Sequence, residues 1–581
     1  MKKIIYIFLT GIFVLPSCID DILTQESAVD LPDAYFWNTT DDALSAVYGV
    51  YNATRTLFGR DYYFDGMGEF QWTRGTSLGS GTWHPQASSA SSMGFMWNNA
   101  YAVVNRANYV RMNLKMMIEK ESNSNTLNTL KRIEGETCFL RALAYFRLIQ
   151  LWGDVPFYTK VLTGNDEAVT LTRTPISAIK DSLLSDLTYA IETLPETLAG
   201  SERGRVSQAA AYGFRGKIAL YWASWKKNGW PELSGFTRDA GEANEYYVRA
   251  AADFEKVIKN YGLKLFGEGN HGTADHPKYW DLFQVANEYD PEIIFSVQYG
   301  GPNLGQGQEL QRDYGTRSTG NAQCWVQATY RLANRYQSLT TGDFLPPLVL
   351  NASATLEGGA RNPASYYNRD WRMKATILWD GQKMLRIDAS GYAVGDSITF
   401  MFGSTDGNTY INYDSNPMTG YLFRKWVRQE GIAERSDGPC DFYLMRLADV
   451  YLMYCEAVNE VSGPNDELVE LVNKIRARGN LPGLAPEKYA DKNAFFDAIE
   501  QERIVELIAE GHRPFDIRRW RKVEAIWPSP TGQVLYNSSG TRIRDEFLNA
   551  PERDYRRFYI YQIPTAERER NVNLTQNDPW L

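Results

Sequence analysis

Hydrophobic side chains recur at helical spacing through the first half of the chain. Leu44, Val47 and Tyr51 share one helical face, and Thr40 and Asp41 before them suit an N-terminal cap. The same period predicts further helices over about 127–152, 174–191, 207–225 and 242–261.

Capping and helix-ending residues support these predicted helix boundaries. Gly153, with Pro156 beyond it, is typical of a helix end. Thr174 and Pro175 form a cap followed by a first-turn proline, and Ser207 can cap the next helix.

Helical periodicity returns near the C-terminal end, over about 447–458, 468–475 and 495–509. Short Gly/Pro breaks such as Gly463-Pro464 join these stripes, which predicts antiparallel helical hairpins stacked on one another. The helices show no clean fixed period, so the pattern alone does not prove a repeat.

Two long segments between the helical blocks lack this period. Residues from about 62 to 92 and from about 266 to 438 are rich in Gly, Ser, Asn, Pro and aromatic residues. Long irregular segments are usually functional, and 293–297 reads as a short strand within the second one.

The first residues have the pattern of a bacterial lipoprotein signal. Met1-Lys2-Lys3 precedes the apolar run 4–14, and Leu15-Pro16-Ser17-Cys18 follows it. The run is too short to span a bilayer, so we expect cleavage and lipidation of Cys18. The alternative is a removed secretory signal with an incidental cysteine.

Asp20 and Asp21 resemble the acidic surface-export signal of Bacteroidetes lipoproteins, which implies the outer leaflet facing the medium.

Length and charge narrow the possible classes of protein. A chain of 581 residues exceeds what one core usually organises, which favours two lobes or one elongated array. Seventy acidic residues against 61 basic ones give a net charge of −9, which disfavours nucleic acid as a partner. Cys138, Cys324, Cys440 and Cys455 are better explained as small buried hydrophobes than as a disulfide framework.

Catalytic signatures are weak. Residues 75–79 spell G-x-S-x-G, but more glycine and loop follow where a nucleophile elbow needs a helix. His84, His271, His276 and His512 have no metal-ligand spacing, and no cofactor motif occurs. Carboxylate pairs for glycoside hydrolysis depend on a three-dimensional separation, so the sequence leaves that alternative open. We expect no enzyme, metal or cofactor.

Aromatic residues are unusually frequent, at 13% of the chain with 16 Trp. Sugar binding needs flat rings against the C–H face and polar side chains for the hydroxyls. The irregular segments supply both, and the predicted ligand-binding residues are Trp72, Trp83, Trp325, Tyr314, Arg74, Asp65, Arg312 and Asn321. Core packing is the alternative for each ring. It is the prediction for Trp97, Trp152, Trp222 and Trp520, which lie on helical stripes.

Several segments carry a family resemblance when they are taken in order. They are Ala34-Tyr35-Phe36-Trp37-Asn38-Thr39, Trp97 with Tyr101 and Asn105, Phe139-Leu140-Arg141-Ala142, Leu151-Trp152-Gly153-Asp154-Val155-Pro156, Arg205-Val206-Ser207, Pro291-Glu292-Ile293-Ile294-Phe295, Arg369-Asp370-Trp371-Arg372, Leu444 to Leu452, Asn473 to Arg478, Glu510-Gly511-His512-Arg513, Tyr561-Gln562-Ile563-Pro564 and Asn573 to Asn577. Together they resemble the SusD/RagB family of surface nutrient-binding lipoproteins.

The resemblance implies an all-α core of tetratricopeptide-like helix pairs, with the irregular segments gathered into a binding face. It implies a glycan ligand and a SusC-like TonB-dependent outer-membrane transporter as partner. The corresponding regions are 1–17 (signal), 18–33 (lipid-anchored tether), 34–265 (N-terminal helical), 266–440 (loop-rich, ligand-binding) and 441–581 (C-terminal helical).

Most of the matching charged residues are predicted to pair across hairpins or to cap helices. They are Arg446, Glu456, Glu502, Arg503, Glu510 and Arg513, and His512 is predicted to be a hydrogen-bonded packing residue. Two other functions stay open, a peptide-binding lipoprotein of a RagAB-like import system and an assembly scaffold without a small ligand.

Overall fold

The computed structural model describes most of the chain. The described residues are 36–73, 90–162, 165–198, 200–300, 304–316, 322–349, 353, 355–379, 382–387, 393–400, 409–410, 421–428, 435–526 and 555–581. The signal 1–17, Cys18, the tether and the G-x-S-x-G segment lie outside these ranges.

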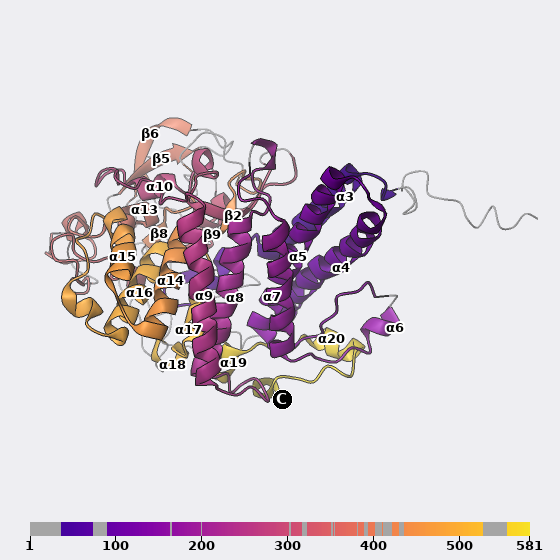
Figure 1. Cartoon of the computed structure of the whole chain (residues 1–581). Helices are drawn as coiled ribbons and strands as arrows, with labels where there is room; N and C mark the ends of the chain where they lie inside the picture. Colours follow the sequence, from indigo (N-terminus) through magenta and orange to yellow (C-terminus); the bar gives the residue numbers. More distant parts are fainter. Residues whose placement is uncertain are drawn as a thin grey trace, which may run out of the picture.

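Long helices pack side by side in one continuous array (Figure 1), in the order α3, α4, α5, α7, α8, α9, α14 and α16. Their bounds are α3 Thr40–Phe58, α4 Ala90–Lys120, α5 Ser124–Trp152, α7 Ile176–Thr193, α8 Gln208–Asn228, α9 Ala240–Asn260, α14 Leu447–Ser462 and α16 Lys492–Leu507, with α15 Asp466–Arg478 beside the last two. The predicted all-α, tetratricopeptide-like hairpin array is confirmed. Within the described ranges, no helix is long and apolar enough to cross a membrane.

Local capping explains where α3 begins. The cap is Thr39, one residue before the predicted position, because its side chain accepts the N–H of Asp42 at 3.2 Å. Asp42 in turn accepts the N–H of Thr39 at 2.8 Å, which completes a capping box.

The cap predicted at Thr174 was wrong. Thr174 forms a β-bridge with Val155, and the N–H of Ile176 is accepted instead by the Asp154 carboxylate at 2.8 Å. The cap predicted at Ser207 is confirmed, since its hydroxyl accepts the N–H of Ala210.

The remaining helices are short. They are α6 Asn165–Ala168, α10 Lys278–Asp281, α11 Leu310–Tyr314, α12 Tyr330–Ala333, α13 Trp371–Thr376, α17 Arg513–Arg519, α18 Val523–Ile526, α19 Arg556–Tyr559 and α20 Thr565–Arg570, with 3-10 turns at Asp61–Met67, Gly200–Glu202, Val285–Asn287, Pro363–Tyr366, Pro486–Tyr489 and Asp578–Trp580. Helices α10 to α13 lie between the two blocks of long helices, α6 lies within the first block, and α17 to α20 follow the second.

Short strands form three small sheets in the described residues. The bounds are β1 Gln71–Thr73, β2 Ile293–Val297, β3 Val326–Ala328, β4 Ile377–Leu378, β5 Lys383–Ile387, β6 Ala393–Phe400, β7 Thr409–Tyr410, β8 Tyr421–Phe423 and β9 Phe442–Arg446. Their orders are β1-β3-β8-β4, β2-β9 and β5-β6-β7. The predicted strand 293–297 is confirmed as β2, which pairs antiparallel with β9 immediately before α14.

The core accounts for the cysteines and for the helical tryptophans. Cys138, Cys324, Cys440 and Cys455 are buried, and none of them forms a disulfide with another described residue, as predicted. Trp97, Trp152, Trp222 and Trp520 are likewise buried, which confirms their structural assignment.

The C-terminal segment clasps the end of α5. The indole N–H of Trp152 donates to the Gln562 carbonyl at 2.9 Å, and the Asn577 amide donates back to the Trp152 carbonyl at 3.1 Å. Arg173 also donates to the Asn577 side chain, at 2.5 Å. The last residues therefore complete the N-terminal half of the body.

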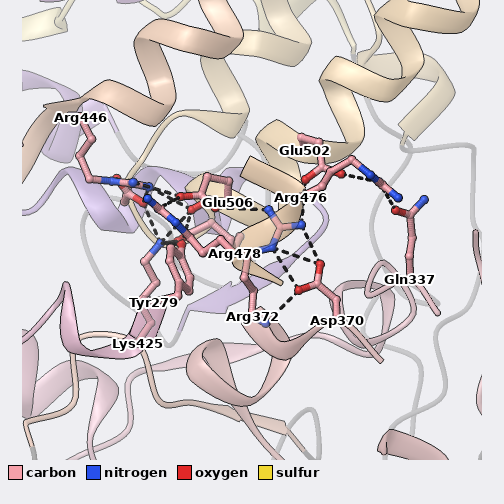
Figure 2. Close-up of polar contacts among 12 residues, drawn as sticks. Tyr279, Gln337, Asp370, Arg372, Lys425, Arg446, Arg476, Arg478, Glu502 and Glu506 are labelled. Atoms are coloured by element: carbon pink, nitrogen blue, oxygen red, sulfur yellow. Dashed lines mark hydrogen bonds and ion pairs between the residues drawn. The ribbon is translucent and has the colours of Figure 1, made fainter. Parts of the chain in front are cut away.

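Ten charged side chains form a buried network between the loop-rich segment and the C-terminal helices (Figure 2). Arg446 contacts Glu292 at 2.5 Å, Glu510 at 2.7 Å and Glu506 at 3.1 Å. Arg478 contacts Glu506 at 2.6 Å. The members are Arg372, Lys425, Arg446, Arg476, Arg478, Glu292, Asp370, Glu502, Glu506 and Glu510.

A second group of contacts continues the network along α16. Arg372 contacts Asp370 at 2.7 Å and Glu502 at 2.8 Å, and Arg476 contacts Glu502 at 2.8 Å and the Gln337 amide at 2.7 Å. Figure 2 shows Arg372 reaching between these residues and Glu506. The predicted structural roles of Arg446, Glu502 and Glu510 are thereby confirmed.

The other matching charged residues pair in the same way. Arg503 contacts Asp449 and Asp516 at 2.8 Å each, Arg519 contacts Glu456, and Arg513 contacts Glu69 at 2.6 Å and Glu500 at 2.7 Å. The predicted structural roles of Glu456, Arg503 and Arg513 are confirmed, and Arg513 ties the C-terminal block to the first irregular segment.

Replacing Glu506 by Gln should destabilise the protein strongly, because the guanidinium groups of Arg372, Arg446 and Arg478 would lose a buried counter-charge. We expect a loss of about 3–5 kcal/mol in the free energy of unfolding, measured by urea denaturation. Glu470→Gln is the matched control, since the Glu470 side chain is 71% exposed and should change stability by no more than about 0.5 kcal/mol. Equal urea midpoints for the two variants would contradict this role of the network.

The contribution of Glu506 should also depend on pH. Burial alone would raise the pKa of Glu506, but Arg478, Arg446 and Arg372 outweigh it and lower this pKa from 4.5 to about 2. A carboxyl group with a lowered pKa stabilises the fold above its unfolded pKa and loses that effect as pH falls. The stability difference between wild type and Glu506→Gln should therefore shrink between pH 4.5 and 2. A constant difference across that window would contradict the assignment.

Candidate ligand-binding region

Strand pairing brings the two irregular segments together. β1 from the first segment pairs antiparallel with β3 from the second, with Trp72 opposite Gln327 and Thr73 opposite Val326. β3 continues the sheet through β8 to β4. The segments predicted to bind ligand therefore meet along one small sheet, although they lie far apart in the sequence.

Trp325 and Arg312 form the part of the predicted site that remains near the surface. Trp325 is half-buried and directly precedes β3, and Arg312 lies on α11. The guanidinium carbon of Arg312 lies 4.4 Å from the centroid of the indole ring, within cation–π range. The structure thus brings these two predicted residues into contact.

Acidic neighbours hold the Arg312 side chain in place. Its Nε donates to the Asp313 carboxylate at 2.8 Å, and it also pairs with Glu309, which contacts Arg60. Burial alone would lower the pKa of Arg312, but Asp313 outweighs it and raises this pKa. Among the described residues, Nη2 of Arg312 is buried without a hydrogen-bond partner. This nitrogen is a charged donor beside an aromatic ring.

Tyr314 lies in the interior instead. Its side chain is fully buried, its ring lies 5.4 Å from that of Tyr62, and its hydroxyl donates to Gln71 at 3.2 Å. Tyr62 in turn donates to Asp313 at 2.6 Å. Tyr314 therefore belongs to a buried tyrosine cluster and offers no ring face to a ligand.

Asp65 and Trp72 are also interior residues. Asp65 is 1% exposed and accepts the backbone N–H groups of Gly511 and Arg513, at 2.9 and 3.2 Å. Burial raises the pKa of Asp65 to about 7. Trp72 is 7% exposed within β1. Trp72 lies in the sheet that joins the two irregular segments, and Asp65 ties the first segment to the C-terminal block. Neither residue can contact a ligand in this conformation.

Three predicted ligand contacts, Arg74, Trp83 and Asn321, lie outside the described residues, as does the predicted lipidation site Cys18.

His512 is buried, and its Nδ1 lies 3.4 Å from the Lys217 ammonium group, which confirms its predicted packing role. In the part of the chain that the structure describes, no group of three or more His, Cys, Asp or Glu side chains could hold a metal ion.

Sequence reasoning missed a cleft of about 770 Å³ between α4 and α20. Its α4 side carries Asn98, Tyr101, Ala102 and Asn105. The signal that could have found it is the spacing of these residues, which places amide and aromatic groups on one helical face without a predicted helix to cover them.

The comparisons with known proteins agree with this architecture, an all-α array with an inserted loop-rich region. Residues 291–580 match the model of the SusD family, and residues 37–220 match a model described as starch-binding associating with outer membrane. The chain belongs to the SusD/RagB family.

Individual relatives are distant but cover nearly the whole chain. SusD-like protein P25 from Formosa agariphila is 26% identical over 534 residues, 89% of each chain. A SusD-like protein from Bacteroides ovatus is 24% identical, covering 95% of this chain and 93% of its own.

Solved structures show the same fold. A SusD-like protein from Bacteroides fragilis has a TM-score of 0.72 at 22% identity, covering 94% of this chain and 98% of its own. A laminarin-binding SusD-like protein has a TM-score of 0.61 at 20% identity, covering 93% and 99%.

Proposed function

We propose that this protein is a surface lipoprotein that captures a polysaccharide or oligosaccharide and delivers it to a SusC-like TonB-dependent outer-membrane transporter. The observation that carries the proposal is the contact between Arg312 and the half-buried Trp325 where the two irregular segments join. Family membership and the laminarin-binding relative support a carbohydrate as the ligand.

The geometry suits binding of a sugar without a chemical reaction. An indole ring such as that of Trp325 packs against the C–H face of a sugar, and polar side chains beside it satisfy the hydroxyl groups at the edge of that face. Each such contact contributes about 0.5–1.5 kcal/mol beyond area burial, which permits later release to a channel. No bond is made or broken in this function.

The location follows from the N-terminal residues. A lipid-modified Cys18 and an acidic tether would hold the body at the outer leaflet of the outer membrane, facing the medium. We further propose that 34–265 and 441–581 form the helical body, and that 266–440 carries the ligand. The body would sit over the transporter as a hinged lid.

Replacing Trp325 or Trp83 by Ala should weaken glycan binding while leaving thermal unfolding nearly unchanged. Loss of one stacking contact of about 0.5–1.5 kcal/mol predicts an affinity roughly 2- to 12-fold lower. Affinity gel electrophoresis against a panel of purified glycans, including laminarin and starch, measures the effect.

Two variants control this experiment. Trp325→Phe keeps an aromatic face and should retain most of the binding. Trp222→Ala removes a buried ring and should cost about 3–5 kcal/mol of stability. A large fall in melting temperature for Trp325→Ala, with binding intact, would show that Trp325 is a core residue.

Calorimetry with oligopeptides tests the peptide-binding alternative on the same protein. Binding of peptides but of no glycan would replace the proposed ligand, and binding of neither would favour the scaffold function.

The proposed lid predicts that a disulfide engineered between this protein and the transporter should abolish uptake. A clamped lid cannot open to admit ligand, and reduction should restore transport. Single-cysteine variants of each protein are the controls, and growth on the identified glycan is the measurement. Undiminished uptake through the oxidised pair would reject the hinge.

A further inference from the structure

A cleft separate from the Trp325 region lies between α4, residues 156–162 and 168–171, and α20. Its volume of about 770 Å³ is within the range of about 300–1,000 Å³ that small-molecule sites occupy. Figure 1 shows α20 and α6 on the opposite side of the view from β8, the strand that pairs with β3. A ligand here would not contact Trp325.

Two tyrosine rings form one wall of the cleft. Tyr101 and Tyr158 stack with their centroids 5.9 Å apart and their planes at 8°. The Tyr101 hydroxyl donates to the Pro156 carbonyl at 2.7 Å, and the Tyr158 hydroxyl donates to the Asn105 side chain at 2.8 Å. Because both hydroxyl groups are bonded to protein, the rings are held in place before any ligand arrives, which lowers the entropic cost of binding.

One face of α4 carries amide groups beside these rings. Asn98, Tyr101, Ala102 and Asn105 are spaced by three, one and three residues and all line the cleft. Asn98, Ala102 and Asn105 are exposed. The side-chain oxygen of Asn105 accepts the hydrogen bond from the Tyr158 hydroxyl group. The two N–H donors of the same amide can therefore bind another group. The small Ala102 leaves room between the two amides.

The facing wall comes from the other end of the chain. Glu567 and Arg570 on α20 line the cleft and form an ion pair at 3.1 Å. Asn571 fixes this wall, since its amide donates to the Leu171 carbonyl at 2.8 Å. Leu171 and Leu574 add apolar surface. The wall is therefore partly apolar and close to neutral in net charge.

This combination fits a neutral saccharide. Aromatic rings suit the C–H face of a sugar, while amide, carboxylate and guanidinium groups at the rim suit its hydroxyl groups. An anionic ligand would need an excess of cations, but Glu567 offsets Arg570. One common mode of peptide binding adds a strand to a sheet edge, and the cleft offers no such edge because no residue lining it belongs to a strand.

We propose that this cleft is a second saccharide-binding site, which takes one or two residues of a neutral glycan. The inference rests on the proposed glycan-binding function and adds a second point of attachment. Two sites on one rigid body raise the apparent affinity for a long polysaccharide much more than for a short oligosaccharide.

Ala102→Trp tests the site, because an indole on the exposed face of α4 would fill the cleft while leaving the core untouched. Calorimetry with laminarihexaose, maltohexaose and the other oligosaccharides of the glycan panel should give two binding events for wild type and one for Ala102→Trp. Retardation by the matching polysaccharide should fall by about tenfold or more. Ala178→Trp, at an exposed position on α7, is the matched control and should behave as wild type.

The outcomes separate the two proposals. Loss of one event in Ala102→Trp, together with weakening of the other event in Trp325→Ala, supports both. One event in wild type that Ala102→Trp leaves unchanged overturns the second site and leaves the proposed function standing. Peptides from a casein digest that bind wild type but not Ala102→Trp would assign the cleft to peptides instead. Failure of every glycan to bind wild type overturns both proposals.

Discussion

Charge compensation in the buried network is the constraint on which the loop-rich region depends. Arg446 at the end of β9, Arg372 on α13 and Glu506 on α16 come from three distant segments and share one desolvated site. An ion left without its partner there costs several kcal/mol, so the segments must meet in one register. A region with little helical structure thereby acquires a fixed position against the helical array, and the join that carries Trp325 is built on that position.

The helical array could be read from the sequence because its signal is local. A buried stripe repeats every three to four residues, and a cap such as Ser207 acts within one turn. The wrong prediction of the α7 cap also has a local cause. Thr174 forms a β-bridge with Val155, and the Asp154 side chain caps α7 instead. Strands such as β1 and β3 contain three residues each, too few for an alternating pattern to stand out.

The site was only partly predictable because exposure in an irregular segment depends on distant pairing. Trp325 and Arg312 lie in contact with each other, but Tyr314 and Trp72 lie inside once β1 pairs with β3. Nothing near Trp72 in the sequence distinguishes a ring that faces solvent from one that faces a sheet. The sequence shows the amide and aromatic face of α4, but the α4–α20 cleft also needs a wall from the opposite end of the chain, which no local pattern indicates.

The clasp of the C-terminal segment on α5 has a consequence for biogenesis. Trp152 and Arg173 obtain their partners Gln562 and Asn577 only after nearly the entire polypeptide has been synthesised. The first helices therefore lack part of their native packing until residues 562–577 have been made. The N-terminal half of the body is thus one of the last parts of the molecule to be completed during folding.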